Sequence, residues 1–298
     1  MRRLTERLAR DIVTVLLAGV SIGLTLTFVG VGEALGLVPS AKDHDWQAYY
    51  NAAERLRFGE PLYPLVADPG TASVYRYPPW FAALWVPLTY LPREIVSVAW
   101  VSAMFLAMLA ALLPLVASQR RPAILLGALL MPFLAQAAIH GNVQPLLVAL
   151  LVYGIDGRWG PVSIGIAASL KGFPIIYSVR YALRGEWRNF ATAIGVAAVL
   201  ASTLLLADLS NYPLYPGSLA GLWLISPVAW GLGAIAAVGI AAWLARSQAG
   251  WFAASVAVVM SIPRLLYYDM TFLVVTGRDL VQPRGTHEPP RSQVARPL

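Results

Sequence analysis

The chain has no cysteine and few charged residues. Of its 298 residues, 12% are charged and 58% are hydrophobic, whereas soluble domains carry about 25% charged residues. Without cysteine, the chain forms neither disulfides nor thiolate-bound metal sites. Walker loops, dinucleotide-binding glycine motifs and zinc-ligand spacings are also missing, so chemistry on soluble nucleotides has no support. The composition excludes an ordinary soluble enzyme and indicates an integral membrane protein.

Apolar runs are spread over most of the chain. Several approach the roughly 20 residues that a membrane-spanning helix requires, and they do not alternate as the strands of a membrane barrel would. We therefore expect an all-α, polytopic membrane bundle with about 8–10 membrane segments. We interpret residues 12–32 as a retained first helix, because this run is longer than the apolar part of a signal peptide. Residues 1–277 would form one domain, and 278–298 a disordered cytoplasmic tail.

The net charge is +7. No basic patch with interleaved aromatic residues is present, so we expect no nucleic-acid partner. Lys and Arg accumulate instead in the cytoplasmic loops of membrane proteins. With the N-terminus inside, residues 33–94 become the first outer loop of a multi-pass protein in the plasma membrane. A functional site built on this loop would then face the outside.

Two apolar runs conflict with this topology unless they turn back. A single crossing by residues 160–182 would leave Arg184 and Arg188 outside. Both this run and residues 250–276 contain a proline that breaks a helix, Pro174 and Pro263. We therefore predict two short, broken hairpins whose tips carry Lys171 and Arg264 near the outer face.

The outer loop at 33–94 holds seven of the fifteen acidic residues. Within it, Trp46, Tyr49 and Tyr50 begin an amphipathic pattern that predicts a helix lying in the membrane interface. A second surface helix is expected after residues 78–79, and the pair would roof an amphiphile-binding cleft. Asp43 and Asp45 open the first helix, and Asp is a preferred N-cap. Because both cannot be that cap, one carboxylate is left as a candidate general base.

Each remaining candidate has a structural alternative. Lys171 and Arg264 would either bind an anionic headgroup, or snorkel and pair with Asp269. His140 and the amides of Asn142 and Gln144 would either contact substrate or hold helices together. The aromatic residues near 75–85 would either stack on sugar rings or belong to an interfacial belt. The candidates for substrate binding are Asp43, Tyr49, Tyr75, Arg76, Tyr77, His140, Asn142, Gln144, Tyr268 and Asp269.

Four segments resemble a known family. They follow one another over most of residues 43–274. In order, they are YYNAAERLRFGEPLY with YRYPPWFAALWVPLTYLP, then GNVQPLLVALLVYG, GIAASLKGFPIIYSV and SIPRLLYYDMTFLV. They resemble glycosyltransferase family 87, membrane enzymes of the GT-C fold that use polyprenyl-phosphate-mannose. The amides of Asn142 and Gln144 stand in exchanged order relative to that pattern, which leaves their acceptor-side role open. The chain is also short for the family.

The resemblance implies a catalytic carboxylate at Asp45 and recognition of the lipid phosphate near Lys171 and Arg264. It implies a polyprenyl-phosphate-sugar donor, a lipid or glycan acceptor and no cofactor. A divalent cation stays an alternative, because the spacing of Asp43 and Asp45 is similar to that of metal-dependent sugar transferases. A lipid phosphate is a good leaving group, so direct, inverting transfer needs one base plus cations that stabilise the phosphate. A transporter or flippase, and an inactive subunit of an assembly, are the rival functions.

Overall fold

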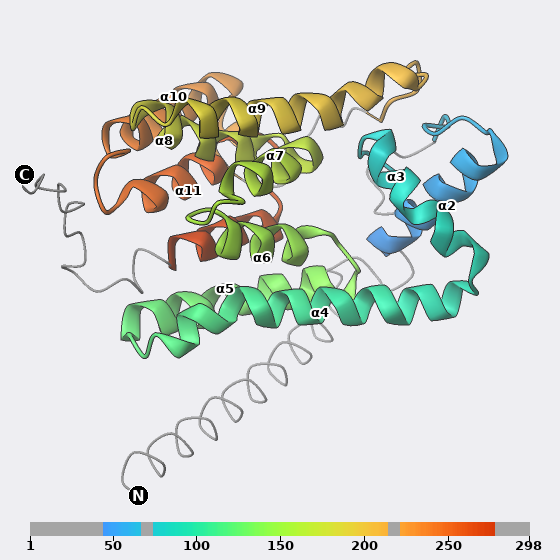
Figure 1. Ribbon diagram of the computed structural model, residues 1–298, viewed down its shortest axis with the longest axis horizontal. Helices are drawn as coiled ribbons and strands as arrows, with labels where there is room; N and C mark the ends of the chain where they lie inside the picture. Colours follow the sequence, from blue (N-terminus) through green and yellow to red (C-terminus); the bar gives the residue numbers. More distant parts are fainter. Residues whose placement is uncertain (1–43, 67–73, 214–220, 278–298) are drawn as a thin grey trace, which may run out of the picture.

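The long helices of the protein form two opposite edges of a bundle. The computed structural model describes residues 44–66, 74–213 and 221–277, and these ranges are helical without strands. Helices α4 (Arg93–Ala117) and α5 (Arg121–Ile139) lie side by side along one edge (Figure 1). Helix α9 (Trp187–Ala201), extended by η3 (Ser202–Leu206), forms the other. All three are long and apolar enough to cross a membrane, which confirms the expected all-α membrane bundle. The proposed first helix and tail lie outside the described residues.

Shorter helices complete the bundle: most lie between these edges, and one, at residues 227–243, lies at the edge where α9 runs (Figure 1). They are α6 (Gln144–Gly154), α7 (Gly160–Lys171), α8 (Tyr177–Leu183), α10 (Pro227–Trp243) and α11 (Gly250–Ser261), with the 3₁₀ segments η2 (Phe173–Ile176), η4 (Leu222–Leu224) and η5 (Tyr267–Thr276). Helix α7 packs against α9, and α10 packs against α11. Several of these helices are shorter than a full span, so other helices have to shield their ends from lipid.

The first predicted hairpin is present. Helix α7 ends at Lys171, where Gly172 has a φ of 70° and Pro174 follows two residues later. A positive φ is readily adopted by glycine and ends the helical path. The chain then returns through η2 and α8, and the Tyr181 hydroxyl donates a hydrogen bond of 2.7 Å to the carbonyl of Ile155, before α7 begins. The start of α7 and the end of α8 therefore lie at the same end of the bundle.

The second predicted hairpin is also present. Helix α11 ends at Ser261, and η5 begins at Tyr267 after an extended break. Gly250, at the start of α11, contacts Arg180 near the end of α8 so closely that a Cβ would overlap the guanidinium. After η5, a Cβ on Gly277 would lie 2.7 Å from Leu115, near the end of α4. Both ends of this hairpin thus return to the end of the bundle where α4 and α8 finish (Figure 1).

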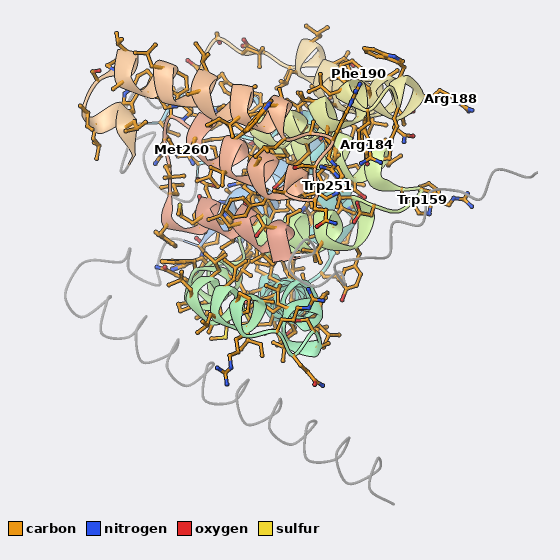
Figure 2. All side chains as sticks on the ribbon, turned by 90° about the vertical axis from the view of Figure 1, so that its left-hand side faces the viewer. Trp159, Arg184, Arg188, Phe190, Trp251 and Met260 are labelled. Carbon is orange, nitrogen blue, oxygen red and sulfur yellow. The ribbon has the colours of Figure 1, made fainter. Side chains whose placement is uncertain are left out.

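Within the described ranges, that end of the bundle carries most of the exposed arginines. The Arg246 Nε donates a 2.8 Å hydrogen bond to the carbonyl of Leu183, so the α10–α11 turn meets the end of α8. Figure 2 faces this end and shows Arg188 at the margin of the bundle; Arg184 and Arg188 are both exposed. Arg158 is exposed on the neighbouring α6–α7 turn. The two hairpins therefore keep these arginines at one end of the bundle, as expected from the preference of Lys and Arg for the cytoplasmic side.

Helices α2 (Asp45–Phe58) and α3 (Pro79–Trp85), followed by η1 (Val86–Tyr90), lie at the other end (Figure 1). Both helices were expected, but the aromatic stripe of α2, expected at the membrane interface, is buried in protein instead. Tyr49 is fully buried and touches the rings of Phe81, Trp85 and Trp100. The stripe faces protein because α3, η1 and α4 cover it, whereas the exposed residues of α2 begin only near its C-terminal end.

Candidate functional site

The Asp45 side chain points toward the turn between α5 and α6. His44 occupies the N-cap of α2, so Asp45 is the first residue inside the helix and is not its cap. Its carboxylate oxygen Oδ2 accepts a 3.0 Å hydrogen bond from Asn142 Nδ2. The two residues are 97 positions apart in the chain. The structure therefore joins the start of α2 to the amide pair, and it does not use Asp45 as a helix cap.

Three hydrogen bonds hold the turn that carries Asn142. The Gln144 backbone N–H donates to Asn142 Oδ1 over 2.8 Å. Trp100 Nε1 donates to the carbonyl of Gly141 over 2.7 Å, and the Val143 N–H donates to the Tyr49 hydroxyl over 3.2 Å. The buried Tyr49 of α2 and the partly buried Trp100 of α4 thus fix the turn on which the amide is mounted.

Gln144 and His140 are buried on either side of Asn142. Gln144 Nε2 donates a 3.1 Å hydrogen bond to the Thr271 hydroxyl, which ties the start of α6 to η5. The His140 ring lies 5.5 Å from the ring of His44, measured between centroids. Both residues therefore pack between elements of the site, and this packing is compatible with the structural alternative that the sequence left open.

The tips of the two hairpins meet through an ion pair. Lys171 Nζ lies 3.6 Å from Asp269 Oδ1 and 4.6 Å from the ring centroid of Tyr268. The other oxygen, Asp269 Oδ2, accepts a 3.0 Å hydrogen bond from the backbone N–H of Leu266. Pairing with Asp269 was one of the alternatives for Lys171 and Arg264, and it is the arrangement observed for Lys171.

Burial and nearby positive charges act on the Asp45 carboxyl group in opposite directions. Burial raises the pKa of its carboxyl group above the ordinary value, while the Asn142 hydrogen bond and the charges of Lys171, Arg76 and His44 lower that pKa. Burial also lowers the pKa of Arg76, and the positive charge of Arg264 acts in the same direction. Lys171 and Arg76 thus act electrostatically on Asp45, and Arg264 acts on Arg76; these three residues are hereafter the cation group.

The sequence of this helical protein matches a known family over much of its length. Residues 75–260, more than half of the 298, match glycosyltransferase family 87. The chain belongs to glycosyltransferase family 87. No curated protein and no solved structure matches it. The matched range includes Arg76, Asn142 and Lys171, whereas Arg264 lies just after its end and Asp45 lies well before its start. The protein is therefore a membrane glycosyltransferase, and the site joins residues from inside and outside the matched range.

The aromatic candidates of the glycosyltransferase have different surroundings. Tyr75 is buried, stacks on Tyr63 and donates a 2.8 Å hydrogen bond to the carbonyl of Pro78. The hydroxyl of the buried Tyr49 donates to the hydroxyl of Tyr77 over 3.4 Å. Tyr77 and Tyr268 are partly exposed. The structure thus encloses Tyr49 and Tyr75 in protein and leaves Tyr77 and Tyr268 more accessible.

Some residues of the site were not identified from the sequence. Trp100 and Thr271 hold Gly141 and Gln144, and the Tyr212 hydroxyl donates a 2.8 Å hydrogen bond to the carbonyl of Arg76. Each lies in a segment distant from its partner, and the only signal was a polar atom within or beside an apolar run. In the described ranges, no group of three or more His, Asp or Glu residues has the geometry of a metal site. Asp43 lies outside those ranges, so the divalent cation stays an untested alternative.

Proposed function

We propose that this glycosyltransferase moves a sugar from a polyprenyl-phosphate donor to a hydroxyl group of a lipid or glycan acceptor. Mannose is the first sugar to test, because the resemblance to the family implies a polyprenyl-phosphate-mannose donor. The observation that carries the proposal is the Asp45 carboxylate, which is hydrogen-bonded to Asn142 and acted on by the positive charges of Lys171 and Arg76. A base for the acceptor and cations for a departing phosphate are the two requirements of direct transfer.

In this mechanism Asp45 takes the proton from the acceptor hydroxyl while that oxygen attacks the anomeric carbon. Burial raises the pKa of the Asp45 carboxyl group, which makes it a stronger base than an exposed aspartate. The Asn142 hydrogen bond and the nearby positive charges oppose this shift and favour the ionised form. Attack from the side opposite the phosphate inverts the anomeric configuration, and no general acid is needed.

The departing lipid phosphate would be bound by the cation group. An arginine offers a phosphate two parallel hydrogen bonds, and a lysine offers a compact charge. Burial and the neighbouring charge of Arg264 both lower the pKa of Arg76, and an anion beside the two guanidinium groups would relieve that repulsion. Lys171 is paired with Asp269, so the phosphate would compete with this carboxylate or share the lysine with it.

We propose that the site faces the outside of the plasma membrane and that the chain crosses the membrane several times. The arginine-bearing turns lie at the end of the bundle opposite α2 and α3 (Figure 1), and Lys and Arg favour the cytoplasmic side. The chain has no natural cysteine, so single variants Glu60→Cys and Arg184→Cys give clean labels. Labelling of both from the same side of intact cells would contradict this orientation.

The decisive experiment incubates the purified protein with labelled polyprenyl-phosphate sugars and candidate acceptors. General-base catalysis contributes about 10²–10⁴-fold, so Asp45→Asn is expected to lose at least about 100-fold in kcat. Glu54→Gln is the matched control, because Glu54 lies on the same helix and pairs with Arg93 at the surface. Wild-type transfer by Asp45→Asn would refute the assignment of the base.

The pH profile gives a second test of the same base. Asp45 has to be ionised to accept a proton, so kcat/KM falls as the pH drops through its pKa. Because burial raises that pKa from 3.8, the acidic limb should lie above the ordinary aspartate range. A profile without an acidic limb above pH 3.8 would contradict the proposed environment of the carboxylate.

A transport function is the second candidate, since broken helices with charged tips are typical of transporters. Both hairpins of this protein have that form, with Lys171 at one tip and Arg264 at the other. Movement of lipid-linked sugar across sealed vesicles, without release of sugar to any acceptor, would favour it. Neither transfer nor movement would favour an inactive subunit.

A further inference from the structure

The amide of Asn142 has a fixed orientation. Its oxygen Oδ1 accepts the backbone N–H of Gln144 over 2.8 Å, and a backbone N–H is only a donor. The amide nitrogen Nδ2 must therefore be the atom that faces Asp45 Oδ2, at 3.0 Å. This assignment does not depend on the choice between two similar amide rotamers, because exchanging the atoms would oppose two donors at Gln144.

The mounting of Asn142 is rigid. Gly141 adopts a φ of 64°, which favours glycine, and a Cβ there would lie 2.9 Å from the Trp46 Cβ. Trp46 follows Asp45 in α2, so the turn and the carboxylate-bearing helix touch directly at this point. Asn142 itself is only 1% exposed. A buried amide with both ends engaged is better suited to orienting a neighbour than to binding substrate.

We propose that Asn142 is a positioning residue for the transfer reaction, holding Asp45 Oδ2 so that Oδ1 is presented to the acceptor hydroxyl. This inference rests on the proposed function, in which Asp45 is the base. It replaces the substrate-binding role expected for Asn142 from the sequence. Asn142 donates its hydrogen bond to the carboxylate in both the resting and the reacting enzyme, and it touches neither donor nor acceptor.

Several charged and titratable groups around Asp45 influence the pKa by which this hydrogen bond is tested. His44 precedes Asp45 on the chain, Arg76 comes from the segment before α3, and Lys171 comes from the tip of the first hairpin. The hydroxyls of Tyr49, Tyr77, Tyr267 and Tyr268 also interact electrostatically with the carboxylate. None of these groups is altered by a substitution at Asn142. Loss of the amide removes a hydrogen bond to the ionised carboxylate and so raises its pKa.

Two variants separate positioning from simple packing. Asn142→Ala removes the donor, and Asn142→Asp keeps the size and an oxygen for the Gln144 N–H but places a second carboxylate beside Asp45. Asn51→Ala is the matched control, because Asn51 is a partly buried amide residue on the same helix as Asp45. Each variant is measured for kcat, KM and the pH profile of kcat/KM, and Asp45 is titrated directly by infrared spectroscopy with Asp45→Asn as the reference.

A hydrogen bond to a charged group has an effect of about 10- to 100-fold. We expect Asn142→Ala to lower kcat by about that factor, with little change in KM, and to move the acidic limb to higher pH. Asn142→Asp should lose more activity near neutral pH and recover partly as the pH rises, whereas Asn51→Ala should behave as wild type. Folded Asn142 variants with wild-type kcat and an unmoved limb would overturn the inference.

The outcomes for the inference and for the proposed function are distinguishable. If Asp45→Asn is inactive while both Asn142 variants match wild type, the positioning role alone fails. If Asp45→Asn retains transfer, the proposed mechanism fails. Even then, the infrared titration still reports whether Asn142 controls the ionisation of Asp45. An unchanged Asp45 titration in Asn142→Ala would refute that control without any substrate present.

Discussion

The ion pair between Lys171 and Asp269 offers the sharpest test of whether a hairpin-tip cation serves the fold, the reaction or both. The side chain of Asp269 is 5% exposed and that of Lys171 is 16% exposed. Asp269→Asn removes the negative partner and keeps an oxygen that accepts the Leu266 N–H. Lys171→Met removes the positive partner and keeps an unbranched side chain. Together the two substitutions replace the ion pair with neutral groups of similar size.

The magnitude follows from the distance and the burial. At 3.6 Å, an effective dielectric constant of 20 gives an attraction of about 4–5 kcal/mol. The cost of removing both charges from water offsets much of this attraction. Removing one partner leaves the other charge buried, which typically costs about 3–5 kcal/mol. Because Lys171 keeps some contact with solvent, we expect about 2–4 kcal/mol of destabilisation for Asp269→Asn.

The assay compares thermal unfolding in detergent, followed by tryptophan fluorescence, with the KM for the polyprenyl-phosphate sugar. We expect Lys171→Met and Asp269→Asn each to lower the unfolding midpoint. The double variant should recover much of that loss, because no unpaired charge remains in the protein. Transfer should not recover in the double variant, since the lysine that we assign to the donor phosphate is missing.

Two results would refute this reasoning. If the double variant regained wild-type KM and kcat, Lys171 would serve only to balance Asp269. If Asp269→Asn were as stable as wild type, the ion pair would not stabilise the meeting of the two hairpins. The surface pair Arg93–Glu54 gives the matched control, because Glu54→Gln removes an exposed partner and should change stability by no more than about 1 kcal/mol.

Two further substitutions test the phosphate site and the turn that mounts Asn142. Arg264→Gln should raise the KM for the lipid-phosphate donor by about tenfold or more, because it removes a charge-assisted bond. Arg246→Gln, at the opposite end of the bundle, should leave this KM unchanged. Equal effects of the two substitutions on the donor KM would argue against phosphate binding by the cation group. Gly141→Ala should lower the free energy of unfolding by about 1–3 kcal/mol. The reason is that Gly141 has a φ of 64° and that the new Cβ would lie 2.9 Å from the Cβ of Trp46. An unfolding midpoint equal to that of the wild type would contradict this close approach.

The hairpins could be predicted from the sequence because they depend on local chemistry. Lys171-Gly172-Phe173-Pro174 combines a residue that readily adopts positive φ with one that breaks a helix. The distribution of arginines then decided between a crossing and a turn, since a crossing would have separated Arg184 from Arg158. The structure has both turns at the expected residues. Local propensity and charge balance were sufficient there.

The orientation of the aromatic stripe and the contacts of Asp45 could not be predicted in the same way. Periodicity shows that Trp46, Tyr49 and Tyr50 share a face, but it is silent on whether protein or lipid covers that face. The partner of Asp45 is 97 residues away, and nothing in the local sequence specifies that distance in space. For the same reason, the sequence alone could not show whether Lys171 pairs with Asp269. The ion pair became visible only once the two hairpins were placed in space.

The two breaks stabilise one another, and this explains how the site keeps buried cations at all. Lys171 ends α7, where the partial negative charge of the helix C-terminus favours a cation. Asp269 joins the other break, because one oxygen accepts the freed Leu266 N–H and the other faces Lys171. A backbone group that would otherwise lack a partner is thus satisfied by the carboxylate that neutralises the lysine. Lys171, one of the cations that act on Asp45, is therefore paired within the fold before any substrate binds, and a donor phosphate would enter an existing ionic arrangement at this residue rather than create one.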